Sequence, residues 1–170
     1  MHLKFSRIAA FLLLGLSIVS FSACNDPCKD IECVNGTCSD GECVCSSGYS
    51  GPDCGTAIND RFEGVYALQE NCLSDSNIAA YNVTLTPKEG TPDEFTILGL
   101  WQTQQNLVTA EIEENGTSFH IDRQGILTGY EVKALVGTIS SDARTVNITY
   151  SIYQSGDSVV VDQCTASLSK

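Results

Sequence analysis

The segment from residue 55 to 170 alternates apolar and polar side chains with a period of two, and it lacks the helical period of 3.6. Glycine, asparagine, aspartate and proline interrupt the alternation about every ten residues, which is typical of turns between short strands. The pattern therefore predicts an all-β domain of eight strands. We expect these strands near residues 62–71, 79–87, 94–101, 107–114, 117–123, 129–140, 145–154 and 158–168.

The alternation gives the strands one apolar face and one polar face. The apolar face collects aliphatic and aromatic side chains: Tyr81, Val83, Leu85, Val108, Ala110, Ile112, Phe119, Ile121, Tyr130, Val132, Ala134, Val136, Val146, Ile148, Tyr150 and Ile152. A sheet with one dry face must close on itself or stack against a second sheet. Eight strands with short links favour a closed antiparallel β-barrel, and a two-sheet β-sandwich is the alternative.

The opening of this domain, Phe62-Glu63-Gly64-Val65-Tyr66, resembles the Gly-x-aromatic start of lipocalins. The resemblance implies a lipocalin-like barrel whose inward aromatics line a cavity for a small apolar ligand. The aromatics concerned are Tyr66, Tyr81, Phe95, Phe119, Tyr130 and Tyr150. The alternative is that they fill the interior, which is the commoner outcome for a barrel of eight strands.

The N-terminal residues predict export. A start that carries Lys4 and Arg7 precedes the apolar run 8–19. As a helix this run would rise roughly 18 Å, too short for a bilayer core of about 30 Å, so it is typical of a secretory signal. Residues 1–23 are therefore predicted to be a signal peptide.

The sequence Phe21-Ser22-Ala23-Cys24 resembles the lipobox of bacterial lipoproteins. The resemblance implies that Cys24 becomes the lipidated N-terminus of a mature chain that starts with residues 24–27. The alternative is an ordinary cleaved signal with Cys24 in a disulfide. The odd count of nine cysteines favours lipidation, because six fit a cluster, two more can pair and Cys24 is left over.

Residues 28–54 carry six cysteines with the spacing C-x4-C-x4-C-x4-C-x-C-x8-C. So short a segment buries too little apolar surface to fold without cross-links. It resembles a tenascin-type EGF-like module, on the residues Asn35-Gly36-x-Cys38, Cys43-Val44-Cys45 and Gly48-Tyr49-x-Gly51-x-x-Cys54. The resemblance implies the disulfides Cys28–Cys38, Cys33–Cys43 and Cys45–Cys54.

Metal sites are the alternatives for this module. Zinc would need four thiolates in a reducing compartment, which an exported chain does not offer. Calcium is the stronger alternative, with Asp26, Asp30 and Glu32 as its candidate ligands. The loop between Cys38 and Cys43 lacks the asparagine and the aromatic residue of calcium-binding EGF-like modules. No cofactor is therefore expected.

Cys72 and Cys164 fall in the first and last predicted strands. They would pair if the barrel closes, because closure makes these two strands neighbours. A disulfide that closes a loop of about 90 residues stabilises the fold by roughly 4–5 kcal/mol in the chain-entropy model.

The charge balance excludes some partners. Nine basic residues face 21 acidic ones, and after removal of the signal the balance is 7 to 21, a net charge of −14. Such a chain does not suit nucleic acid, and it does not suit electrostatic docking on anionic lipid.

We find no catalytic motif in the sequence, and we expect no enzyme activity. His120 and Asp122 share a strand face, as do Glu111 and Glu113, but neither pair has a third ligand or a nucleophile. Acids of this kind are more often a solvated strand face than a glycosidase pair.

The ligand candidates are Trp101, Gln102, Gln104 and Gln105, since an indole beside amides at a strand end can stack on a sugar and hydrogen-bond to it. The alternative is a tryptophan that packs inward at the barrel end.

These observations predict a lipoprotein of the Gram-negative cell envelope, anchored to the outer membrane and facing either the surface or the periplasm. Residues 28–54 would be an EGF-like stalk and residues 55–170 a β-barrel. The leading function is a non-catalytic binding or adhesion module with a protein or glycan partner. The alternatives are a carrier of a small apolar ligand and an accessory or inhibitory subunit of an envelope enzyme.

Overall fold

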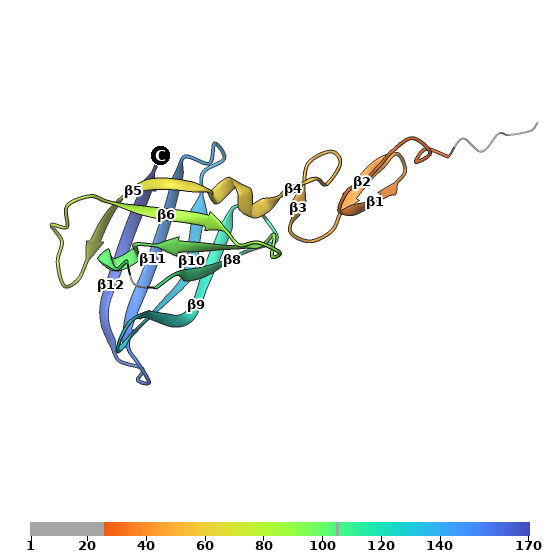
Figure 1. Ribbon diagram of the computed structural model, residues 1–170. Helices are drawn as coiled ribbons and strands as arrows, with labels where there is room; N and C mark the ends of the chain where they lie inside the picture. Colours follow the sequence, from red (N-terminus) through yellow and green to blue (C-terminus); the bar gives the residue numbers. More distant parts are fainter. Residues whose placement is uncertain (1–25, 105) are drawn as a thin grey trace, which may run out of the picture.

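The computed structural model describes residues 26–104 and 106–170. The predicted signal peptide, Cys24 and Gln105 lie outside the described residues. The described chain is all-β, with a small disulfide-rich module followed by a barrel (Figure 1). No helix in the described part of the chain is long and apolar enough to cross a membrane.

Eight antiparallel strands form the barrel, in the order of the sequence. They are β5 (Gly64–Cys72), β6 (Tyr81–Pro87), β7 (Glu94–Leu98), β8 (Val108–Ile112), β9 (Ser118–Leu127), β10 (Tyr130–Ile139), β11 (Thr145–Gln154) and β12 (Val160–Ser169). Each strand pairs with the next along the chain, and β12 pairs with β5, so the sheet closes. The prediction of a closed eight-stranded barrel is confirmed, and the β-sandwich is not formed.

A disulfide crosses the seam at which the barrel closes. Cys72 of β5 and Cys164 of β12 are register partners, with Cα atoms 4.0 Å apart, and their sulfurs are bonded. This is the pair that barrel closure predicts from the sequence.

The N-terminal module consists of two small hairpins. Strands β1 (Gly36–Ser39) and β2 (Glu42–Cys45) pair with each other, as do β3 (Tyr49–Ser50) and β4 (Thr56–Ala57). Three disulfides join Cys28 to Cys38, Cys33 to Cys43 and Cys45 to Cys54, the pairs that the EGF-like resemblance implies. With little apolar core available, the cross-links carry most of the stability of the module.

A short 3₁₀ helix, η1 (Ile58–Phe62), covers one end of the barrel. The strand expected to start at residue 62 therefore starts at Gly64. Phe62 is fully buried, stacks on Phe95 with ring centroids 4.2 Å apart and meets Phe119 edge-on at 5.6 Å. Arg61 donates to the carbonyls of Gly116 and Ser140 in two turns at this end. We call this end the proximal end, because the N-terminal module joins it (Figure 1).

Asn59 holds η1 against the turn between β6 and β7. Its buried Nδ2 lies 3.3, 3.0 and 2.8 Å from the carbonyl oxygens of Lys88, Thr91 and Glu94. The two amide hydrogens are thus shared among three acceptors in one turn. The same turn supports the module, because a Cβ atom on Gly48 would lie only 2.6 Å from Cγ of Pro92.

The interior of the barrel is filled by side chains. Tyr66, Phe95, Phe119 and Tyr150 are at most 1% exposed and belong to one continuous apolar cluster. Tyr81 and Tyr130 are only partly buried and pack at the edge of that cluster.

One expected core position is wrong. Val136 was predicted to point inward, but its side chain is 54% exposed. A β-bulge between Lys133 and Val136 shifts the register of β10 against β11, so the alternation changes phase. Beyond the bulge Gly137 faces inward, where the Phe119 ring packs directly on it, and a Cβ atom there would lie 2.2 Å from Cζ of Phe119.

We expect removal of the seam disulfide to destabilise the barrel. Replacing Cys72 and Cys164 together by alanine should lower the free energy of unfolding by about 2–5 kcal/mol, because the unfolded chain regains the freedom of a long loop. Urea unfolding followed by the fluorescence of the single tryptophan, Trp101, measures this loss. The matched control replaces Cys33 and Cys43 by alanine, which should leave the barrel transition nearly unchanged. Equal midpoints for the seam variant and the unmodified protein would contradict the expectation.

Substitution of Asn59 tests the attachment of η1. Asn59→Ala removes the side-chain donor to three carbonyls, each of which keeps a backbone donor, and should cost about 0.5–1.5 kcal/mol of stability. Asn59→Asp should cost more, since a carboxylate would face the same three oxygens. Urea unfolding of both variants gives the order, with the exposed neighbour Asp60→Asn as the control. An aspartate variant at least as stable as the alanine variant would rule out this role for the amide.

Candidate functional site

The two ends of the barrel differ in what they carry. The proximal end carries η1 and the N-terminal module, and the loops that follow β5, β7, β9 and β11 lie at the opposite, distal end (Figure 1). The distal end is therefore the part of the barrel that the N-terminal module leaves uncovered.

A hollow of about 510 Å³ lies at the distal end. Trp101, Gln102 and Gln104 line it together with Ile78 and Leu127. Three of the four residues predicted to bind a ligand are thus neighbours in one hollow. The fourth, Gln105, lies outside the described residues.

Trp101 and Gln102 belong to a second short 3₁₀ helix, η2 (Leu100–Gln102), with an unusual backbone. Both residues have left-handed φ angles, of 54° and 53°. Gly99, two residues before Trp101, has a φ angle of 106°. Left-handed backbone at two successive non-glycine residues costs energy, of the order of 1–3 kcal/mol each. Surrounding contacts must therefore hold η2 in place.

Two buried carboxylates supply these contacts. Asp162, only 3% exposed, accepts hydrogen bonds from Nε1 of Trp101 at 3.2 Å and from the Oγ and backbone N of Ser74 at 2.6 and 3.1 Å. Burial alone would raise the pKa of Asp162, but the hydrogen bonds from Ser74 and Trp101 outweigh it and hold the pKa below its ordinary value. The Trp101 ring also packs edge-on against Tyr130, with centroids 5.4 Å apart.

The second carboxylate, Glu70, acts on η2 through a tyrosine. Glu70 is 1% exposed and accepts hydrogen bonds from the hydroxyls of Tyr81, at 2.7 Å, and Tyr150. Tyr81 in turn accepts a hydrogen bond from the backbone N of Gln102 at 3.1 Å. Burial, and then the neighbouring Glu70, raise the pKa of both tyrosine hydroxyls far above the usual value, so they remain donors.

Sequence reasoning missed Glu70 and Asp162 as interior residues. Their positions do contain the signal, because Glu70 lies two residues before Cys72, and Asp162 lies two residues before Cys164. In a strand such residues share a face with the cysteines. An acid in phase with an inward cysteine indicates a buried carboxylate.

The carboxylate oxygens of this polar cluster are all used by hydrogen bonds within the protein. Both Glu70 oxygens accept from tyrosines, and no buried side-chain nitrogen or oxygen in the described chain lacks a partner. Among the described residues, three potential metal ligands come within 4.8 Å of one another only at Glu70, Cys72 and Cys164. Since the two cysteines are joined in a disulfide, that group offers no thiolate. We interpret the cluster as a latch that holds η2.

The calcium candidates do not converge. Asp26 accepts a hydrogen bond from the backbone N of Cys28 at 3.0 Å, an ordinary local turn. Asp26, Asp30 and Glu32 are not among the described residues whose ligand atoms lie within 4.8 Å of one another. The three side chains therefore do not form one group of carboxylate ligands in the described part of the chain.

His120 meets acids, but not the one that shares its strand face. Its Nδ1 lies 2.8 Å from Glu113 and its Nε2 lies 3.5 Å from Glu111, the register partner of His120 on β8. Both glutamates are more than half exposed. Exposed pairs of this kind contribute at most about 1 kcal/mol, which fits a solvated strand face.

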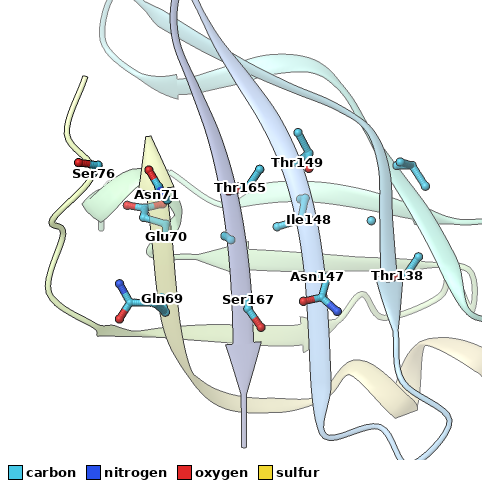
Figure 2. Close-up of a pocket in the computed structure, with 13 residues that line it drawn as sticks. Gln69, Glu70, Asn71, Ser76, Thr138, Asn147, Ile148, Thr149, Thr165 and Ser167 are labelled. Atoms are coloured by element: carbon cyan, nitrogen blue, oxygen red, sulfur yellow. The ribbon is translucent and has the colours of Figure 1, made fainter. Parts of the chain in front are cut away.

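A second hollow, of about 540 Å³, lies on the outer wall of the barrel (Figure 2). Its floor is made of side chains that project outward from β5, β12, β11 and β10, and these include Asn71, Thr165 and Asn147. The period-two alternation predicts that Asn147 and Thr149 lie on the polar face, but it did not indicate a hollow there.

Comparison with known proteins assigns no function to this chain. No protein-family model matches the chain, and no curated protein matches it. The candidate sites are the distal end with its Trp101 hollow and the outer hollow on the seam side.

The latch predicts a pH dependence of the Trp101 environment. Because the pKa of Asp162 is depressed in the folded state, its charged form stabilises the protein above the ordinary aspartate pKa of about 3.9, and this stabilisation is lost as pH falls through the folded value. Trp101 fluorescence should therefore change with a midpoint below about 3.9.

The control for this titration is substitution. Asp162→Asn should abolish the step, whereas Asp122→Asn, at an exposed aspartate, should leave it in place. Circular dichroism recorded in parallel separates the local change from unfolding. A step that persists in Asp162→Asn would contradict the assignment of the latch.

Proposed function

We propose that this protein is a non-catalytic binding module of the Gram-negative cell envelope. A lipid on Cys24 would hold it to the outer membrane, the disulfide-rich N-terminal module would act as an EGF-like spacer, and the distal end of the barrel would contact a protein partner. The observation that carries the proposal is the arrangement of the two ends of the barrel, because the distal end lies opposite the end that the N-terminal module joins (Figure 1).

Exposed aliphatic side chains at the distal end support a protein partner. Leu73 follows β5 and is 81% exposed, and Leu107 and Val159 are exposed beside β8 and β12. The proximal turns at residues 88–93, 113–117 and 140–144 carry no exposed large aliphatic side chain. Exposed apolar side chains on the loops at one end of a protein are a feature that interaction sites use.

The spacer role is supported by the cross-links and by the junction. Three disulfides stiffen a module with almost no core, and such bonds persist in an oxidising compartment. The backbone N of Ile58 donates to Gly48 at 2.9 Å, and that of Asn59 donates to Pro92 at 3.0 Å. These contacts tie the module to the barrel, so a binding surface would be presented in a defined direction.

The filled interior favours surface binding over transport of a small apolar ligand. Phe62, Phe95 and Phe119 pack on one another in the proximal half, and Glu70 holds Tyr150 in the distal half. A carrier would need these side chains to leave the volume that its ligand occupies.

Lipidation is tested by detergent partitioning of the full chain expressed in a Gram-negative host. The unmodified protein should enter the detergent phase, and Cys24→Ser should remain in the aqueous phase, because it lacks the cysteine that would carry the lipid. Equal partitioning of the two proteins would rule out the lipid anchor.

The distal surface is tested by cross-linking in the intact envelope. A variant with Leu73→Ser, Leu107→Ser and Val159→Ser should lose the cross-linked protein products of the unmodified chain, because the aliphatic contacts are removed. Val65→Ser is the matched control, since Val65 is 60% exposed at the proximal start of β5, the strand that Leu73 follows at the distal end. Products that survive the triple variant would place the contact elsewhere on the molecule.

A further inference from the structure

The outer wall on the seam side carries two rows of side chains in register across four strands. The first row runs from Val136 on β10 through Thr149 and Thr165 to Asn71 on β5. The second row is Thr138, Asn147, Ser167 and Gln69. Seven of these eight side chains bear a hydroxyl or an amide, and none is charged. Figure 2 shows most of them projecting from adjacent strands toward one hollow.

The hollow over these rows has the size of a ligand site and an open shape. Its volume of about 540 Å³ lies in the usual range of roughly 300–1,000 Å³ for such sites. Ser76, in the loop after β5, borders it on one side, and Val136, lifted by the bulge of β10, borders it on the other. An open trough of this kind admits a chain that continues beyond it at both ends.

The polar groups in the trough are not used by the fold. Across the described residues, the side chains of Asn71, Asn147, Thr149 and Thr165 have no hydrogen-bond partner in the protein. Gln69 differs, because its Nε2 donates to the carbonyl oxygen of Ile78 at 2.8 Å. Each free amide or hydroxyl can both donate and accept, so the trough offers a dense and flexible array of hydrogen bonds.

The two rows carry no charged side chain. The mature chain has a large excess of acids, yet none of them projects from the two rows. A basic partner would find no carboxylate in the trough, and an acidic one would meet the negative field of the surrounding protein. The wall therefore suits an uncharged ligand.

We propose that this trough binds an uncharged polysaccharide. Sugar hydroxyls donate and accept as the amides and hydroxyls of the trough do, and the methyl groups of Thr138, Thr149 and Val136 offer apolar contact to the C–H faces of sugar rings. A protein partner is less suited, because the centres of protein interfaces are enriched in aromatic, methionine and arginine side chains and depleted in serine, and the two rows contain none of the former. The site is separate from the distal surface and does not depend on the lipid anchor.

Native gel electrophoresis of the full-length protein in non-ionic detergent tests the proposal. Each gel contains one polymer. The uncharged polymers are dextran, mannan, xylan and a mixed-linkage β-glucan, and the anionic polymers are alginate and hyaluronate. At least one uncharged polymer should retard the protein, and the anionic polymers should not. The variant Asn147→Ala with Thr149→Val should weaken that retardation roughly tenfold or more, because two pairs of hydrogen bonds are lost.

The matched control is Asn82→Ala with Thr84→Val, which removes the same groups from the outer face of β6, away from the trough. It should be retarded like the unmodified protein, and circular dichroism should match for all three. Retardation by no uncharged polymer overturns the proposal, as does retardation that survives the trough variant or falls equally in the control. Sedimentation measures self-association in parallel. If the protein self-associates, binds no polymer, and loses the self-association in the trough variant, the wall is a contact between copies of the chain and the proposal is overturned.

Discussion

The pairing of β12 with β5 is the constraint on which the rest of the structure depends. This pair closes the sheet, and the Cys72–Cys164 disulfide fixes its register at one point. Since side chains alternate along a strand, that register also decides which neighbouring residues point in and which point out. Glu70 and Asp162 share the inward phase of the cysteines, whereas Asn71 and Thr165 take the outward phase. A slip of one residue at the seam would exchange the two sets, so the interior latch and the outer trough follow from one pairing.

Much of the fold could be predicted from the sequence, because the information was local. Period-two alternation with turn residues between the runs is enough to predict eight strands, and the need to bury one face is enough to predict closure. Three features were missed for identifiable reasons. The helix η1 is short and depends on the contacts of Asn59 with a distant turn. The bulge at Val136 changes phase within an unbroken apolar run, and alternation alone does not show where a strand skips a residue. From the sequence alone Glu70 and Asp162 resemble solvated acids. Their burial follows only once the pairing of β5 with β12 shows that Cys72 and Cys164 point inward.

The candidate site was predicted in composition but not in role. The indole of Trp101 and the amides of Gln102 and Gln104 do gather in one hollow, as their nearness in the chain suggests. However, the indole N–H is used by Asp162, and the backbone of Gln102 is used by Tyr81. The local sequence does not predict these two hydrogen bonds, because the partners Asp162 and Tyr81 lie on the distant strands β12 and β6. The consequence is that these hydrogen bonds hold η2 in one conformation, so its side chains lie at defined positions.

Fixing the distal loop also separates the two surfaces that the barrel presents. The latch binds η2 from within and uses polar groups that face the interior, so it leaves the outward groups of the same strands free. Those free groups form the trough along the wall, while the aliphatic side chains of the loops remain at the distal end. A polymer lying in the trough would cross β5, β12, β11 and β10, and it would leave Leu107 beside β8 uncovered. The closed barrel therefore keeps the proposed polysaccharide surface apart from the proposed protein surface, and neither surface has to open the core.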